Sequence, residues 1–229
     1  MIVDGRVVVG DIALGYGSAG TPGAPPIVLL HALGEERATW SDVVDVLANT
    51  YRTYAVDLRG HGSSDHPGAY SLELMRDDVI GFLDALDLPS VDFVGHSLGA
   101  YVAYLVAMAV PSRVAAMVLE DPPAPLPADP PRDASAEPDG PVDFDWAVVT
   151  ALAQQRNQPD PLWWDQLDRI TARTLVIAGG PDSHLPQDQL LELAHRIPNA
   201  EHVTIAAGHC VHENRLAEFL AAAMPVLSR

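Results

Sequence analysis

VGHSLGA, residues 94–100, places one serine between two glycines, directly after one apolar run and directly before another. The flanking runs predict a strand followed by a helix, so the serine must occupy a sharp turn. Neighbours two positions away on either side then have to be small, which Gly95 and Gly99 provide. Such a turn lifts the Ser97 hydroxyl above the sheet. It also puts the Leu98 N–H at a helix N-terminus, where negative charge is favoured. Ser97 is therefore a candidate functional residue.

Short β-branched apolar runs alternate with segments of helical spacing along the rest of the chain. Strands are predicted over residues 6–17 (a strand or hairpin), 25–31, 51–58, 91–96, 113–121, 173–180 and 201–206. Helices are predicted over residues 38–50, 71–88, 98–110, 188–197 and 211–227. Strands that alternate with helices imply a mostly parallel, doubly wound α/β sheet with helices on both faces.

One segment interrupts this alternation. Residues 122–141 contain eight prolines in twenty positions, and no regular element tolerates so many fixed φ angles and missing donors. We expect residues 122–167 to form a short lid insertion in a core domain made of residues 1–121 and 168–229. A disordered linker is the alternative, but this segment carries four large aromatic side chains that favour burial: Phe144, Trp146, Trp163 and Trp164.

The composition limits the class of protein. The chain has 229 residues, and 13 Lys+Arg against 31 Asp+Glu give a formal net charge of -18. Nucleic acid and anionic membrane surfaces are therefore poor partners, because both favour a basic face. Cys210 is the single cysteine, which leaves no intrachain disulfide. No secretory signal is recognisable, and no run approaches the roughly 20 apolar residues of a membrane span, so we expect a soluble cytoplasmic protein.

A serine nucleophile requires a base and an orienting acid. In open α/β sheets ligands bind at the carboxyl ends of the strands, so residues that follow strands are the candidates. His209 lies directly after the last predicted strand, and Asp182 follows the strand before it, after two glycines and a proline. The chain order Ser97, Asp182, His209 is that of serine hydrolases built on such sheets.

Four segments then carry a resemblance to a known family: HALGEERATW (31–40), DLRGHGSSD (57–65), GHSLG (95–99) and GHCVHENR (208–215). The chain resembles the α/β-hydrolase superfamily over essentially its full length, in its serine-nucleophile, esterase-like members. It departs from that pattern at Ala32 and Ala100, where the family usually has glycine.

The resemblance implies a role for each candidate. Ser97 would attack a carbonyl, His209 would take the serine proton, and Asp182 would orient His209. The N–H groups of Leu33 and Leu98 would form the oxyanion hole.

Several residues keep alternative roles. Asp121 ends the strand before the insertion, a position that some family members use for the acid, although we favour Asp182. His96 is expected to have a packing or supporting role rather than that of the base. We expect no cofactor and no metal, because the pattern around His209 and His212 lacks a third convergent ligand. Four residues are weak candidates for pocket walls or for core: Trp40, Trp146, Trp163 and His184.

The predicted function is a serine hydrolase that cleaves a carboxylic ester, lactone or thioester through an acyl-enzyme. Its substrate would be a small molecule with an apolar acyl or aryl group, and the sequence does not indicate the oligomeric state. Carbon–carbon bond hydrolysis and cofactor-free haloperoxidase or perhydrolase chemistry use the same triad and remain alternatives. A ligand receptor or a biosynthetic cyclase on the same fold is a third possibility. Serine at position 97 argues against epoxide hydrolase and dehalogenase chemistry, which use aspartate there.

Overall fold

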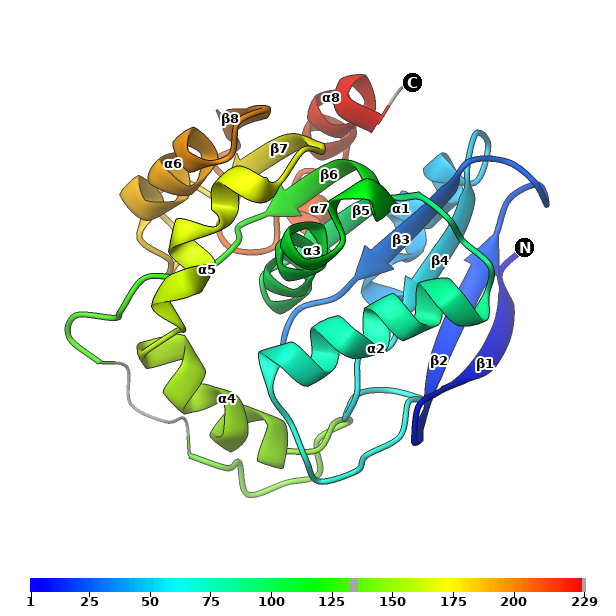
Figure 1. The fold of residues 1–229 in the computed structure, drawn as a ribbon, viewed down its shortest axis with the longest axis horizontal. Helices are drawn as coiled ribbons and strands as arrows, with labels where there is room; N and C mark the ends of the chain where they lie inside the picture. The colour runs from blue at the N-terminus through cyan, green and yellow to red at the C-terminus, as the bar shows by residue number, and fades with distance from the viewer. Residues whose placement is uncertain (132–135, 228–229) are drawn as a thin grey trace.

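The centre of the fold is an eight-stranded sheet with the strand order β1-β2-β4-β3-β5-β6-β7-β8 (Figure 1). We analysed a computed structural model, which describes residues 1–131 and 136–227. The strands β1 (Val3–Val9) and β2 (Ile12–Ala19) form an antiparallel hairpin, and β2 pairs antiparallel with β4. The other pairings are parallel. The remaining strands are β3 (Pro26–Leu30), β4 (Arg52–Val56), β5 (Val91–His96), β6 (Val114–Glu120), β7 (Arg173–Ala178) and β8 (Ala200–Thr204).

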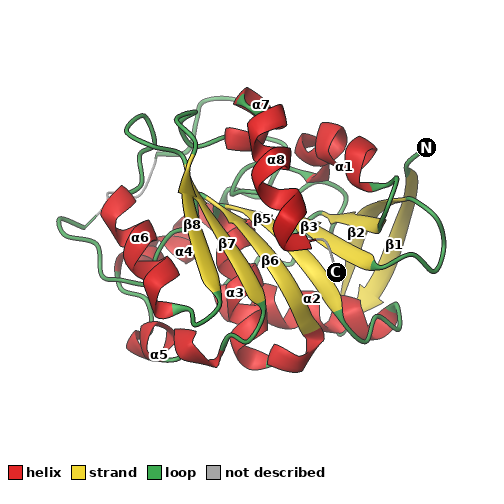
Figure 2. Ribbon diagram, turned by 90° about the horizontal axis from the view of Figure 1, so that it is seen from above, coloured by secondary structure: helices red, strands yellow, loops and turns green. Residues whose placement is uncertain are grey.

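Helices cover both faces of the sheet, as Figure 2 shows, which confirms the predicted α/β fold class. One face packs against α2 (Leu72–Ala85), α3 (Leu98–Ala109) and α6 (Gln187–Arg196). The other face packs against α1 (Ser41–Leu47) and α8 (Leu216–Leu227). The strand β3 shows how one apolar run serves both cores. Val28 and Leu30 belong to the first core, whereas Ile27 and Leu29 belong to the second, because successive side chains of a strand alternate between faces.

Local signals explain where the helices begin and end. The Ser71 side chain accepts a hydrogen bond from the Leu74 N–H at 3.1 Å and caps α2, as expected for a residue with a side-chain oxygen at this position. The predicted helix over residues 211–227 is instead two helices, α7 (Val211–Asn214) and α8. They are separated at Arg215, whose φ of -143° lies outside the helical region.

Among the described residues between β6 and β7, the helices are α4 (Ala147–Asn157) and α5 (Pro161–Asp165). Residues 132–135 of the proline-rich stretch lie outside the described residues. The Asp145 N–H donates to the Gly60 carbonyl at 2.7 Å, and Phe144 forms a β-bridge with His61, so the end of this segment is fixed to the loop after β4. Its division from the core as a separate lid stays a prediction.

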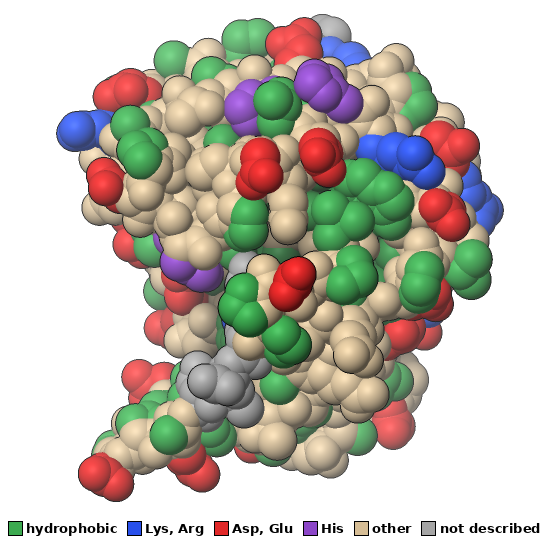
Figure 3. Space-filling model, turned by 90° about the vertical axis from the view of Figure 1, so that its left-hand side faces the viewer, with side chains coloured by type: hydrophobic (Ala, Val, Ile, Leu, Met, Phe, Trp, Pro, Cys, Tyr) green, Lys and Arg blue, Asp and Glu red, His purple; other side chains and the backbone are tan. Residues whose placement is uncertain are grey.

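The surface reflects the composition of the chain. Acidic side chains are scattered over the face in Figure 3, in keeping with the formal net charge of -18. Within the described residues, no helix has both the length and the apolar character needed to cross a membrane.

Candidate active site

Ser97 occupies a strained turn between β5 and α3. Its φ is 49°, in the left-handed region that non-glycine residues rarely adopt. A Cβ on Gly99 would lie 2.1 Å from the Leu30 carbonyl oxygen, and one on Gly95 would lie 2.6 Å from the Ala100 nitrogen. The two glycines are therefore required because the start of α3 lies directly against β3 and the end of β5.

The strand β6 brings an acid beside this turn. His96 on β5 pairs with Glu120 on β6, and the Ser97 N–H donates to the Glu120 carbonyl at 2.9 Å. Asp121 is the next residue, with a φ of 41°. Its Oδ2 lies 2.6 Å from Nδ1 of His209, which follows β8. Asp121 and His209 therefore meet at the carboxyl edge of the sheet, where the elbow also lies.

Asp121 is held as a carboxylate. It is completely buried, and it accepts hydrogen bonds from the Gly179 N–H at 2.9 Å and the Ser183 hydroxyl at 2.5 Å. Burial raises the pKa of Asp121, but the hydrogen bonds from His209, Ser183 and Gly179 outweigh it and leave the pKa below its ordinary value. Because a carboxylate faces Nδ1, this nitrogen of His209 carries the proton, which leaves Nε2 as the basic atom.

The loop after β3 presents backbone amides near Ser97. The Ala32 N–H donates to Glu35 at 3.1 Å, and the Gly34 N–H donates to Nε2 of His61 at 3.2 Å. Leu33 lies between these two anchored amides. Leu98 is the first residue of α3, so its N–H is one of those that have no partner within the helix. The two predicted oxyanion donors, Leu33 and Leu98, line the same cavity as Ser97.

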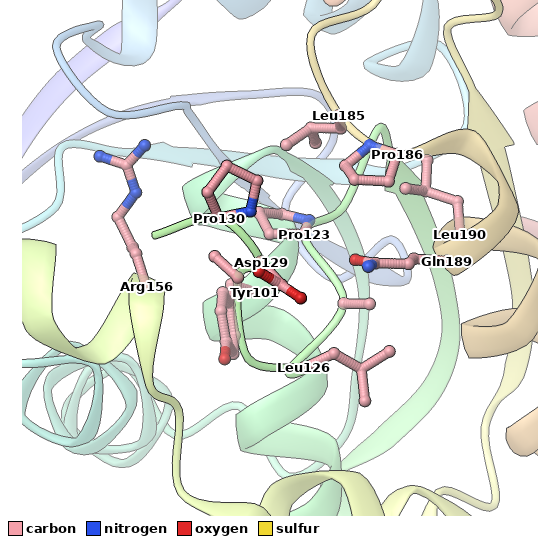
Figure 4. A pocket seen from close by; sticks show the side chains of 12 residues that line it. Tyr101, Pro123, Leu126, Asp129, Pro130, Arg156, Leu185, Pro186, Gln189 and Leu190 are labelled. Atoms are coloured by element: carbon pink, nitrogen blue, oxygen red, sulfur yellow. The ribbon is translucent and has the colours of Figure 1, made fainter. Parts of the chain in front are cut away.

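That cavity has a volume of about 410 Å³ and contains both Ser97 and His209 in its wall. The segment after β6 contributes a third or more of the lining: Pro123, Phe144, Trp146, Val149, Leu152 and Arg156. The rest of the wall comes from the core of the molecule. A second cavity of about 100 Å³ shares Tyr101, Pro123, Arg156 and Leu185 with the first and therefore adjoins it (Figure 4).

A model of the alpha/beta hydrolase fold family matches residues 25–147, more than half of the 229-residue chain. The chain belongs to this family.

Three similar proteins illustrate the range of the family. A 3-oxoadipate enol-lactonase from Acinetobacter baylyi is 32% identical over 104 residues, which are 45% of this chain and 39% of the relative. Epoxide hydrolase A from Mycobacterium tuberculosis is 35% identical over 110 residues, 46% of this chain and 34% of the relative. A crystal structure of a hydrolase from Pseudomonas aeruginosa PA01 is 25% identical, with a TM-score of 0.85, and covers 99% of this chain and 98% of that chain.

The matches to curated relatives are partial. The matched part of the chain spans only 28% to 39% of the length of the curated relatives. The solved structure, by contrast, is similar over almost the whole length of both chains. The α/β-hydrolase fold is thus established for the chain.

In this α/β hydrolase the acid beside His209 differs from the one favoured on sequence. Asp182, expected to orient His209, is exposed, and among the described residues the carboxylate on Nδ1 of His209 is that of Asp121. The structure therefore puts the alternative, Asp121, rather than the favoured Asp182, against His209, and the role of Asp121 as the orienting acid is a proposal. The end of β6 lies beside the elbow because β5 and β6 are paired neighbours, and chain order alone does not contain this information.

The structure separates the four residues that the sequence assigned to pocket walls or to the core. Trp146 and His184 line the cavity beside Ser97. Trp40 is fully buried in the core on the α1 and α8 face and stacks on His212 with ring centroids 4.1 Å apart. Trp163 is buried against Tyr101, with ring centroids 5.8 Å apart, and belongs to the core on the α3 face. Large aromatic side chains are common both in cores and in pocket walls, so the residue type alone could not separate the two roles.

Two buried histidines fix the loop of Leu33, although no sequence pattern predicts this role for them. His31 accepts from the Leu58 N–H at 3.0 Å and donates from Nδ1 to the Ala32 carbonyl at 2.7 Å. His61 accepts from Gly34 and faces the Arg59 carbonyl with Nδ1 at 3.1 Å. Each ring meets one donor and one acceptor, so each is neutral in a single tautomer. Burial, with the neighbouring His31, lowers the pKa of His61 to about 3.

Proposed function

We propose that this α/β hydrolase is a serine hydrolase that cleaves a carboxylic ester, lactone or thioester, with Ser97, His209 and Asp121 as its triad. The observation that carries the proposal is the hydrogen bond from Nδ1 of His209 to the buried Asp121, in the wall of the cavity that Ser97 also lines. An acid–histidine pair that leaves Nε2 basic is the arrangement that activates a serine hydroxyl.

Each residue has a defined task in the reaction. Nε2 of His209 takes the Ser97 proton while Oγ attacks the carbonyl carbon of the substrate. The N–H groups of Leu33 and Leu98 donate to the oxyanion, and losing one such donor would cost about 3 kcal/mol of barrier. When the intermediate collapses, His209 returns the proton to the departing alcohol or thiol. Water then attacks the acyl-enzyme by the same route, which releases the carboxylic acid and the free Ser97.

The cavity supports a substrate with an apolar acyl or aryl group. Leucine, valine, phenylalanine and tryptophan side chains make up much of its wall, and Arg156 and Glu35 are charged groups within it. A volume of about 410 Å³ lies within the usual range for small-molecule sites. The enol-lactonase relative is consistent with a cyclic ester as one member of this class. Serine rather than aspartate at the elbow supports ester chemistry over epoxide opening.

Turnover of p-nitrophenyl acetate and hexanoate, together with labelling by a fluorophosphonate probe, tests the proposal. We expect the probe to add to Ser97 in the wild-type chain, as located by peptide mass spectrometry. Ser97→Ala should abolish both labelling and at least 99.9% of the turnover, since triad residues act as a unit worth roughly 10⁶-fold in kcat.

The matched control is Ser112→Ala, which removes an exposed serine that follows the opposite end of α3 from the elbow. It should leave labelling and turnover unchanged. Undiminished turnover in Ser97→Ala, or a wild-type chain that the probe does not label, would contradict the proposed function.

A further inference from the structure

His96, the residue before Ser97, is fully buried and bridges two other segments of the site. Its Nε2 lies 2.9 Å from the backbone carbonyl oxygen of His209, and its Nδ1 lies 3.4 Å from Oε2 of Glu35. Both neighbours are hydrogen-bond acceptors only. Both ring nitrogens must therefore carry hydrogen to satisfy them, which makes His96 an imidazolium. This distinguishes it from the neutral rings of His31 and His61.

Each of the two partners belongs to a segment that the proposed reaction uses. Oε2 of Glu35 also accepts from the Ala32 N–H at 3.1 Å, so it anchors the amide that precedes Leu33. The carbonyl that His96 contacts is the backbone of the proposed base itself, and the two imidazole rings lie 4.6 Å apart. His96 thus connects the nucleophile's turn, the loop of Leu33 and the loop of His209.

We propose that His96 is a positioning residue, whose imidazolium holds the Leu33 loop and the His209 loop in register with Ser97. This inference rests on the proposed function for its catalytic consequence. The geometric reason is that the three segments come from three separate strand ends. A misplacement of about 1 Å between a base and a nucleophile can reduce a rate roughly 100-fold.

The charges around His96 support this role. Burial lowers the pKa of His96, but the carboxylates of Glu120 and Glu35 and the His209 carbonyl raise it to about 9. His212 faces the ring as well, at 5.4 Å between centroids, and it holds Glu120 through its N–H at 2.8 Å and its Nδ1 at 2.7 Å. Burial raises the pKa of Glu35, and His96 outweighs it and lowers that pKa to about 2. At neutral pH His96 is therefore a cation and Glu35 is a carboxylate.

The variants His96→Asn and Glu35→Gln test the proposal. Asparagine is uncharged, and its single NH₂ group cannot reach both Glu35 and the His209 carbonyl as the imidazolium does. Glutamine at position 35 removes the negative charge that His96 faces. We expect kcat on p-nitrophenyl esters to fall roughly 10- to 100-fold in each variant, with KM changed less than threefold. The double variant should be little worse than either single one, because both remove the same bridge. The wild-type kcat/KM should decline above about pH 9, and His96→Asn should lack this alkaline decline.

Asp78→Asn is the matched control, because Asp78 forms a buried ion pair with Arg59 that touches none of the three segments. It should lower the melting temperature without changing the pH profile or kcat. If His96→Asn has the same profile and kcat as the control, the ring only stabilises the fold and the proposal is overturned.

Hydrogen exchange provides a readout that does not depend on activity. In His96→Asn, and not in Asp78→Asn, peptides that cover residues 31–36 and 206–211 should exchange faster together. A wild-type chain that the fluorophosphonate does not label would refute the proposed function. Even then, simultaneous loss of protection in both peptides of His96→Asn would support the bridge. Unchanged protection in either peptide would overturn it.

Discussion

Asp121 accepts hydrogen bonds from four residues, Gly179, Ser183, Gln187 and His209, and is completely buried, whereas Asp182 is exposed to solvent. These four donors explain how a carboxylate is kept charged at this depth, because each replaces part of the lost hydration. The Gly179 N–H, the Ser183 hydroxyl and the Gln187 amide also donate to the carboxylate of Asp121, so its orientation toward His209 is fixed. A freely rotating surface carboxylate could not select one tautomer of the base so strictly.

Asp121→Asn should therefore reduce kcat on p-nitrophenyl esters by roughly 10³- to 10⁴-fold, because an amide allows the wrong tautomer of His209. Asp182→Asn, the matched control, should stay within threefold of wild type. Initial rates at saturating substrate measure both. The assignment would fail if the effects of the two substitutions were reversed.

Single residues differ in how well the sequence predicted them. The turn at Ser97 could be predicted because it needs two glycines at fixed spacing, and the structure has that turn. The position of His209 could be predicted because it follows a strand at the same edge of the sheet, and both residues line one cavity. Which carboxylate contacts His209 could not be predicted, since Asp121 and Asp182 both follow strands and differ only in which strand end is adjacent to His209. Glu35 and His61 carried no local pattern, because their role depends on contacts across the fold.

The first turn of α3 packs directly against β3. The first turn of the helix approaches the Leu30 carbonyl so closely that no side chain fits at position 99. The helix is held there because nearly every residue of α3 is buried, between the sheet and α2. The strained serine is stable only because this packing holds the turn on both sides.

Gly99→Ala should accordingly destabilise the protein by about 2 kcal/mol or more, since backbone rather than a flexible side chain must move. Gly140→Ala is the control, because no heavy atom within 4 Å of the added Cβ is found there. Urea unfolding followed by circular dichroism gives both values. Equal midpoints for the two variants would show that the turn can relax.

The segment that carries α4 gives the cavity a wall that can be changed separately from the core. Trp146 is partly exposed and lines the cavity, whereas Trp40 is fully buried on the opposite face of the sheet.

Trp146→Ala should raise KM several-fold for esters with a bulky aryl acyl group while it leaves acetate esters nearly unchanged, because it removes only a cavity wall. Trp40→Ala should instead cost about 3 to 5 kcal/mol of stability. Steady-state kinetics on the two substrates and thermal melting separate these effects. A large stability loss in Trp146→Ala would place it in the core.

Whole elements were predicted to within a few residues, because buried parallel strands are continuous apolar runs and the helices between them have a different period. The break between α7 and α8 was missed, since residues 211–227 keep an apolar helical spacing through it. Which aromatic residues of the 122–167 segment face the cavity could not be predicted either, because prolines remove the periodicity that assigns a face.

At the scale of the whole molecule, acid should destabilise the protein partly through Glu35. Its pKa in the folded chain is about 2 against an ordinary 4.5, so the folded state binds fewer protons between these values than the unfolded state does. The stability from this group is fully present above about pH 4.5 and is lost as the pH falls toward 2.

Wild type should therefore lose more unfolding free energy between pH 5 and pH 3 than Glu35→Gln does. The other acidic residues titrate alike in both proteins, so their contribution cancels in the comparison. Urea titrations at the two pH values measure the difference. Parallel losses in the two proteins would mean that Glu35 has an ordinary pKa when folded.

The position of the proposed acid directly after β6 also has an evolutionary consequence. In the proposed triad the loop after β7, residues 179–186, need not supply the carboxylate, yet it contributes His184 and Leu185 to the cavity wall. Substitutions there can diversify substrate preference with little loss of chemistry, provided that Gly179 and Ser183 keep their hydrogen bonds to Asp121. For directed evolution this loop is the most promising place to build a focused library.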